Sequence, residues 1–172
     1  LLLLYNFYRY AVNQGYRFPL SDTGFRLYSQ FEEDGILLYL FAAIGSENKN
    51  FIDIGSGDGI NSNCANLTIN FGWYGLFIDG NQANIEKGRH FYEGHPDTWA
   101  YPPKFVHAFV TRGNINELIW NSGFGHRGID LMSIDIDGND YWIWDALSVV
   151  EPRVVIIGTQ TVFGMHNIVV PY

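Results

Sequence analysis

The sequence predicts an α/β fold, a three-layer sandwich in which a mostly parallel sheet of about five strands lies between two layers of helices. Two observations predict it. Short apolar runs of strand length alternate with amphipathic segments of helix length, which is typical of a parallel sheet covered on both faces. Polar and glycine residues also gather just after each apolar run. In a doubly wound sheet the carboxyl ends of the strands form the ligand-binding edge, so these residues are expected to meet there.

The first segment, residues 1–28, is expected to be an irregular lead-in. It is rich in Tyr, Phe and Leu but keeps neither the strand nor the helix period, and a glycine and a proline interrupt it, which leaves room for one short helix. Ser29 and Glu32 then have the spacing of a capping box. Apolar residues recur behind them at helical spacing, which predicts a helix over residues 30–43.

Strands and helices then alternate. Apolar runs predict strands at residues 51–54, 74–78, 105–110, 129–134 and 153–157. Helical spacing of apolar residues predicts helices over residues 60–71, 82–92, 115–121 and 140–149. Neither an internal repeat nor a low-complexity linker divides the chain, so residues 1–172 are expected to form one domain.

Composition disfavours several classes of function. The net charge of -8 disfavours a nucleic-acid binder, because such proteins usually present a basic face. No apolar run approaches the roughly 20 residues that span a bilayer, so no membrane span is expected. Cys64 is the only cysteine, which fits a reducing compartment such as the cytoplasm. The chain starts with neither Met nor a signal-peptide pattern, so we expect it to begin inside a longer reading frame.

A glycine-rich loop follows the first predicted strand. Residues 51–59 read FIDIGSGDG, in which Asp53, Gly55, Gly57 and Gly59 form the pattern D-x-G-x-G-x-G. Glycine lets the chain turn sharply out of a strand and lets a ligand approach bare backbone. A dinucleotide site would carry G-x-G-x-x-G, whereas here the third glycine comes one position earlier. The loop therefore predicts a nucleotide-type cofactor, and its glycine spacing disfavours a dinucleotide.

Asp79 ends the second predicted strand, in the segment GLFIDGN. An acidic side chain after the second strand accepts hydrogen bonds from a ribose diol in nucleotide-binding α/β proteins. Asp79 is therefore the expected ribose ligand. The alternative is that its carboxylate caps the helix that follows.

With these segments in place, the chain resembles the FkbM-type methyltransferases. The glycine loop is similar to motif I of the class I S-adenosylmethionine-dependent methyltransferases. The segments SQFEEDGIL, GLFIDGN, VTRGNINEL and DLMSIDIDGNDYWIWDAL carry the rest of the resemblance, which covers residues 29–172. The resemblance implies a Rossmann-like fold, S-adenosyl-L-methionine as cofactor, and O-methylation of a small hydroxylated acceptor, a sugar or related natural product.

The resemblance also implies which residues hold the cofactor. They are Asp53, Gly55, Ser56, Gly57, Asp58, Gly59, Asp79, Asn81, Thr111 and Asp135. Gln30 and Asp34 are candidates to close over it, and an ordinary surface helix explains them equally well. After the fifth strand the chain departs from similar proteins, with Gly158, Thr159 and Gln160 where an acidic residue, an aromatic residue and an asparagine are usual. The short segment beyond leaves open whether the final antiparallel strand pair of this fold is present.

Methyl transfer to a hydroxyl needs alignment of the reactants and a base that takes the hydroxyl proton. Asp135 is the first candidate for this base, followed by Asp137 and His166. For Asp137 and Asp140 the alternative is capping of the helix that begins near Asp140. A structural or solvent-facing role is the alternative for His166.

Further alternatives stay open. Residues 135–140 are rich in the oxygen ligands of Mg²⁺ and Ca²⁺, as in catechol-type O-methyltransferases, but the Asp-Asn pair that those enzymes carry after the next strand is absent, so no metal site is assigned. An NAD-dependent oxidoreductase is disfavoured by the glycine spacing, and a non-catalytic or incomplete cofactor-binding domain is the third alternative. The run Tyr141, Trp142 and Trp144 could stack on an acceptor, but at helical spacing it is more often core. The sequence does not indicate an oligomeric state.

Overall fold

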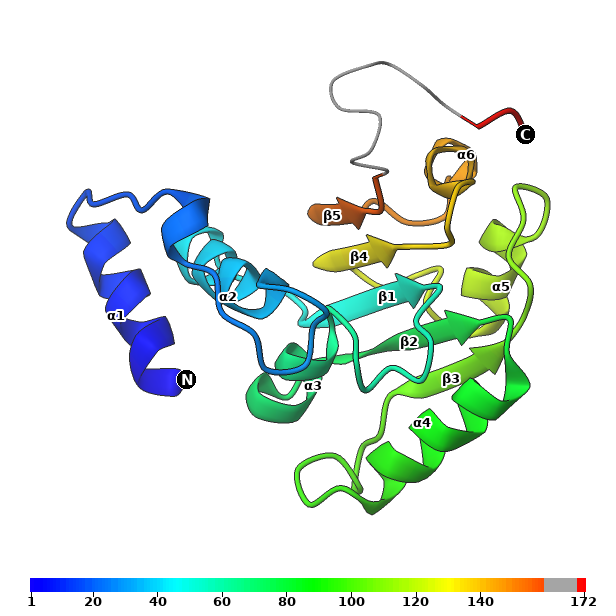
Figure 1. Cartoon of the computed structure of the whole chain (residues 1–172), viewed down its shortest axis with the longest axis horizontal. Helices are drawn as coiled ribbons and strands as arrows, with labels where there is room; N and C mark the ends of the chain where they lie inside the picture. Colours follow the sequence, from blue (N-terminus) through cyan, green and yellow to red (C-terminus); the bar gives the residue numbers. More distant parts are fainter. Residues whose placement is uncertain (160–169) are drawn as a thin grey trace.

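The computed structural model describes residues 1–159 and 170–172. The described residues form a five-stranded sheet in the order β3-β2-β1-β4-β5, in which every neighbouring pair is parallel (Figure 1). The strands are β1 Asn50–Ile54, β2 Tyr74–Asp79, β3 Lys104–His107, β4 Leu131–Ile134 and β5 Val154–Ile157. This strand order is that of a Rossmann-like sheet, so the predicted α/β fold is confirmed.

The strand order reverses at β1. Ile54 of β1 lies beside Ile78 of β2 on one side and beside Ile134 of β4 on the other. The chain therefore builds the sheet outward from β1 first toward β3 and then toward β5 (Figure 1). In open parallel sheets, ligands bind beside such a reversal, at the carboxyl ends of the strands. The loops after β1 and β4 are thus the place to look for a site.

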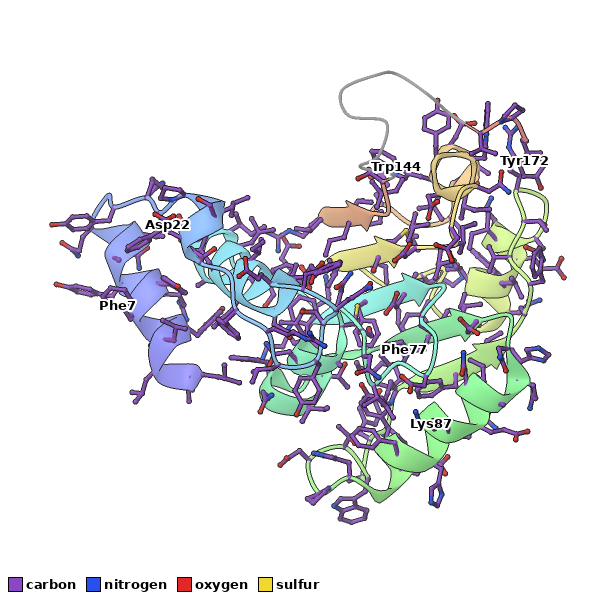
Figure 2. The ribbon with its side chains drawn as sticks, viewed as in Figure 1. Phe7, Asp22, Phe77, Lys87, Trp144 and Tyr172 are labelled. Carbon is purple, nitrogen blue, oxygen red and sulfur yellow. The ribbon has the colours of Figure 1, made fainter. Side chains whose placement is uncertain are left out.

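Helices cover both faces of the sheet. One face carries α2 Glu33–Ile44, α3 Ala65–Phe71 and α4 Gln82–Gly94, and the other carries α5 Ile115–Asn121 and α6 Asp140–Ala146. Successive strand residues pack on opposite layers. Phe51 and Phe77 pack on the first layer, where Phe77 lies between the sheet and α4 (Figure 2), and Ile52 and Leu76 pack on the second. The three-layer arrangement expected from the sequence is present.

The lead-in is more regular than expected. It forms α1 Leu2–Asn13, which lies beside α2, and a 3-10 turn, η1 Leu20–Asp22 (Figure 1). Tyr8 of α1 is buried against α2 and meets Tyr39 edge to face, with 5.1 Å between ring centroids. Phe7, on the same helix, stays exposed (Figure 2). Because apolar residues occupy both faces of α1, its helical period is hidden in the sequence.

The helix after the glycine loop begins at Ala65, later than expected. Two side chains accept hydrogen bonds from backbone N–H groups in the intervening segment. The Asp58 carboxylate accepts hydrogen bonds from the N–H groups of Ile60 and Asn61, and the Ser62 hydroxyl accepts one from the N–H two positions further on. Short polar side chains compete with helix formation in this way. The glycine loop is consequently long, and no helix starts directly behind it.

Helix α2 also begins later than expected, and the predicted capping box is wrong because the N-cap Glu32 makes no side-chain cap hydrogen bond. Instead the buried carboxylate of Asp34 accepts hydrogen bonds from the three N–H groups of residues 27–29, at 2.7 to 2.9 Å. Asp34 thus folds the preceding segment back onto the start of α2. Of the helices that the structure describes, none is long and apolar enough to cross a membrane.

Candidate functional site

A cleft of about 910 Å³ opens at the carboxyl ends of β1, β4 and β5. Its walls come from the glycine loop, the turn between β4 and α6, the end of β5 and the start of α2. The cleft therefore lies at the reversal of strand order. Small-molecule sites span about 300–1,000 Å³, so this one leaves room for a cofactor together with a small acceptor.

The glycine loop packs tightly at its start and is open further along. The N–H groups of Gly55 and Ser56 donate hydrogen bonds to the carbonyl of Ile78 at the end of β2. Gly55 has a φ of +78°, and a Cβ there would overlap the main chain of Asp135. Gly57 has a φ of +57°, and nothing lies within 4 Å of the place that a Cβ would take. Gly55 is needed for packing, whereas Gly57 offers bare backbone that a ligand can approach.

Asp53 lies in the wall of the cleft and is buried, with 3% of its surface exposed. The Ser62 hydroxyl donates a hydrogen bond to its carboxylate. Burial raises the pKa of Asp53 to about 6; the hydroxyls of Ser62 and Ser133 oppose this rise, and the charges of Asp135 and Asp79 add to it. A cation bound beside such a carboxylate stabilises its charged form.

The turn after β4 presents the carboxylates of Asp135 and Asp137 to the cleft. Asp140 holds this turn, because its buried carboxylate accepts hydrogen bonds from the N–H groups of Ile136 at 2.8 Å and Gly138 at 2.9 Å. Asp137 has a φ of +59°, which is uncommon for a residue with a side chain and is found more often at functional sites. The N-cap of α6 is Asn139, so neither Asp137 nor Asp140 occupies the capping position that was the alternative for them.

Asp135, unlike Asp140, accepts no hydrogen bond from the residues that the structure describes. Partial burial raises the pKa of its carboxyl group, and the negative charges of Asp140, Asp137 and Glu33 raise it further. Within residues 1–159 and 170–172, no hydrogen bond to the carboxylate offsets these effects. A raised pKa brings a carboxylate closer to the operating pH of a general base.

The structure brings together part of the predicted site. The predicted residues that line the cleft are Asp53, Gly55, Ser56, Asp135 and Asp137. Those placed outside its lining are Gly57, Asp58, Gly59, Asp79, Asn81 and Thr111. Gln30, suggested to close over the cofactor, lines the cleft as well, whereas Asp34 holds the segment before α2. His166 lies outside the described residues.

Asp79 connects the glycine loop to the start of α4. Its carboxylate accepts hydrogen bonds from the N–H groups of Gly57 at 2.9 Å and Asn81 at 2.8 Å. The N-cap of α4 is Asn81, whose side chain accepts a hydrogen bond from the N–H of Ala83. The cap of this helix is therefore supplied by Asn81, and Asp79 stands beside the bare backbone of the loop.

Asp58 and Thr111 have local partners. The Asp58 carboxylate forms an ion pair with Lys87, at 2.7 Å between oxygen and Nζ. The N–H of Thr111 donates a hydrogen bond to the side chain of Asn114 in the turn before α5. Both residues thus have a structural role in addition to any role in binding.

Among the residues of the cleft wall that sequence reasoning missed are the polar side chains of Glu33, Asn61, Ser62, Asn63 and Ser133. Ser62 and Asn63 fall in a segment that was expected to be helical. Ser133 could have been found, because it is a lone polar residue in a buried strand and lies directly beside Asp53 in the β1–β4 register. Glu33 gave no sequence signal, since only the fold brings the start of α2 to this edge of the sheet.

The cleft is strongly acidic. Its lining includes the carboxylates of Glu33, Asp53, Asp135, Asp137 and Asp140, and no Lys, Arg or His is among the described lining residues. Such a site attracts cations and repels phosphate groups. No group of three or more His, Cys, Asp and Glu side chains in the described part of the chain is arranged to hold a metal ion.

Aromatic side chains border the cleft. Phe31, Tyr141 and Trp144 line it and keep 64%, 46% and 45% of their surfaces exposed. The expectation that the aromatic run of α6 is core is therefore wrong for Tyr141 and Trp144. Trp142 packs elsewhere, against Tyr172, and Figure 2 shows Trp144 and Tyr172 on different sides of α6.

Comparisons with known proteins add a structural likeness. No protein-family model and no curated protein matches the chain. The chain is similar to a crystal structure from Plasmodium falciparum, assigned as a protein-L-isoaspartate O-methyltransferase (beta-aspartate methyltransferase), in complex with S-adenosyl-L-homocysteine. The two are 15% identical with a TM-score of 0.43, and the match covers 74% of this chain and 62% of that chain, which is less than two thirds of its length. Membership of the FkbM-type family stays a prediction from the sequence motifs.

Proposed function

We propose that this chain is a single-domain methyltransferase that uses S-adenosyl-L-methionine and methylates a hydroxyl of a small acceptor, a sugar or related natural product. The observation that carries the proposal is the acidic cleft behind the D-x-G-x-G-x-G loop. The cofactor carries an ammonium and a sulfonium group and no phosphate. Its positive charges complement the carboxylates of the cleft wall.

The same observations oppose a dinucleotide. A pyrophosphate is bound by the N-terminus of a helix that starts directly behind the glycine loop, but here α3 starts only at Ala65. The carboxylates of the cleft would also repel a pyrophosphate, and no cationic side chain among the described lining residues would offset them. An NAD-dependent oxidoreductase is therefore disfavoured on charge as well as on glycine spacing.

The residues present fit the proposed cofactor. Asp53 is a buried carboxylate in the cleft wall and would hold the ammonium group, and the bare backbone at Gly57 would receive the ligand without a Cβ in the way. Asp79 would hold the ribose, since carboxylate oxygens that already accept one N–H each retain acceptor capacity. Asn81 and Thr111 are the proposed neighbours of the ribose and adenine. When bound, the cofactor supplies an electrophilic methyl group.

Asp135 is the proposed general base. A sugar hydroxyl becomes a good nucleophile when its proton is removed, and Asp135 would accept that proton within the cleft. Its raised pKa makes it a stronger base than an ordinary carboxylate. Asp137 is the second candidate, and His166 is the third. The exposed aromatic side chains of Phe31, Tyr141 and Trp144 would contact the acceptor.

The proposal is tested by transfer of a radiolabelled methyl group to a panel of hydroxylated sugars, with and without a chelator. We expect transfer that the chelator does not abolish. Asp135→Asn should lower turnover by roughly 10²- to 10⁴-fold, the usual contribution of a general base. Its affinity for S-adenosylhomocysteine should change less than about threefold.

The matched control is Asp145→Asn. Asp145 lies on α6 but pairs with Arg112 and does not line the cleft, so this variant should keep its turnover. Normal turnover in Asp135→Asn would remove Asp135 from the mechanism. Cofactor binding without transfer to any member of the panel would favour the non-catalytic alternative. The buried Cys64 supports a reducing compartment such as the cytoplasm as the place where the protein acts.

A further inference from the structure

We propose that Gly158 is a positioning residue for Asp135, because its missing side chain leaves the space into which the Asp135 carboxylate turns. The inference rests on the proposed function in one respect, namely that Asp135 is the base for methyl transfer. Gly158 and Asp135 both line the cleft.

The two residues are neighbours at the carboxyl edge of the sheet. Strands β4 and β5 pair in parallel as far as Ile134 beside Ile157, and the N–H of Gly158 donates a hydrogen bond to the carbonyl of Ile134 at 2.8 Å. Asp135 and Gly158 are the next residues of the two strands. Neighbouring positions in parallel register direct their side chains to the same face. A side chain at position 158 would therefore compete with Asp135 for one space.

The geometry shows that Asp135 already occupies this space. A Cβ on Gly158 would lie 2.7 Å from Oδ1 of Asp135 and 3.4 Å from its Cγ. The first distance is too short for a carbon–oxygen contact, so the carboxylate or the strand would have to move. The same Cβ would lie 3.3 Å from Oδ1 of Asp140. The two carboxylates thus converge over bare backbone.

Asp135 is the group that would yield. The Asp140 carboxylate is buried and is held by the N–H groups of Ile136 and Gly138. Asp135 has no comparable anchor among the residues that the structure describes. Its orientation is therefore set by the shape of its surroundings, and Gly158 provides that shape. A displacement of about 1 Å of a reacting group can cost about 10²-fold in rate.

The test is Gly158→Ala in the full chain, with Gly94→Ala as the matched control. Gly94 ends α4, and nothing lies within 4 Å of the place that a Cβ would take there. We expect Gly158→Ala to lower kcat by about 10- to 100-fold while affinity for S-adenosylhomocysteine changes less than about threefold. The pH titration of the Asp135 carboxyl group, followed by NMR, should shift upward, because the new methyl group displaces water from it. The control should change neither.

A double variant tests the contact between position 158 and Asp135 independently of methyl transfer. In the Asp135→Ala background the carboxylate is gone, so adding Gly158→Ala should leave Tm almost unchanged, whereas in the wild type it should lower Tm by up to about 2–4 °C. If Gly158→Ala alone fails to fold, the double variant should fold. Equal losses of Tm in both backgrounds, a double variant that does not fold, or an unshifted Asp135 titration would overturn the inference. Absence of methyl transfer with every acceptor would refute the proposed function. The Tm and titration results would still show whether a side chain at position 158 displaces the Asp135 carboxylate.

Discussion

Asp53 combines deep burial with a place in the cleft wall, and this makes its charge sensitive to pH and to ligand. The folded pKa is about 6, against an ordinary value of 3.8. Between these values the folded chain holds a proton that the unfolded chain has lost. The stability contributed by the protonated form is complete below about pH 4 and is lost as the pH rises to about 6, a change of about 3 kcal/mol.

Replacement of this carboxyl group should remove that pH dependence. The Asp53→Asn side chain keeps an acceptor for the Ser62 hydroxyl but does not ionise. Its free energy of unfolding, relative to wild type, should therefore increase by about 3 kcal/mol between pH 4 and pH 7. Urea unfolding at several pH values measures the difference, with the exposed Asp97→Asn as control. Parallel curves for wild type and Asp53→Asn would show that Asp53 does not titrate as described.

At the scale of elements, aspartate carboxylates hold loops by accepting hydrogen bonds from two or three nearby backbone N–H groups. Asp34 does so before α2, Asp58 in the glycine loop and Asp140 in the turn after β4. The fourth case is Asp130, which lies just before β4 and holds the loop that enters β1 from α2. Each carboxylate thereby supplies partners for backbone donors outside the regular elements. These contacts place the loops that form the cleft.

The Asp130 contact predicts a large loss of stability on replacement. Asp130 is fully buried; its carboxylate accepts hydrogen bonds from the N–H groups of residues 47–49, and Arg153 donates one at 2.9 Å. Asp130→Asn leaves some of these donors unpaired and should lower the free energy of unfolding by about 2–4 kcal/mol at pH 7. Chemical denaturation measures the loss, and Asp97→Asn serves again as the exposed control. A loss below about 0.5 kcal/mol would contradict the structural role.

The pH dependence of this contact has the opposite sign to that of Asp53. Burial acts to raise the pKa of Asp130, but hydrogen bonds from the loop and from Arg153 outweigh it and hold the pKa below its ordinary value. The stabilisation is therefore present above about pH 4 and is lost as the pH falls below it. Wild type should lose this stabilisation in acid. The difference in free energy of unfolding between wild type and Asp130→Asn should therefore become smaller as the pH falls.

The strands and the helices from α2 onward could be predicted because their apolar residues follow one clear period. The late starts of α2 and α3 have a common cause. Asp58 and Ser62 accept hydrogen bonds from backbone N–H groups in the segment before α3, and Asp34 accepts such bonds before α2. These side chains compete with helix formation, and the periodicity of apolar residues does not reveal this competition. Helix α1 failed for another reason, since Phe7 and other apolar residues on its exposed face hide its period.

At the scale of the whole molecule, the edge of the sheet that carries the cleft could be predicted, because polar residues follow each strand and the strand order reverses beside β1. The composition of the cleft could not. Glu33 comes from α2, and only the fold brings it to the edge of the sheet that carries Asp53 and Asp135. Asp79, expected in the same pocket, instead stands at the glycine loop beside Gly57. The acidic character that favours a cationic cofactor is thus a property of the assembled molecule.

Isothermal titration calorimetry of the full chain with S-adenosylhomocysteine and, separately, with NAD⁺ tests the central claim most directly. The account predicts saturable binding of S-adenosylhomocysteine, no detectable binding of NAD⁺, and at least tenfold weaker binding of S-adenosylhomocysteine to Asp79→Ala, in which a proposed ribose partner is lost. Binding of NAD⁺ in preference to S-adenosylhomocysteine would contradict it.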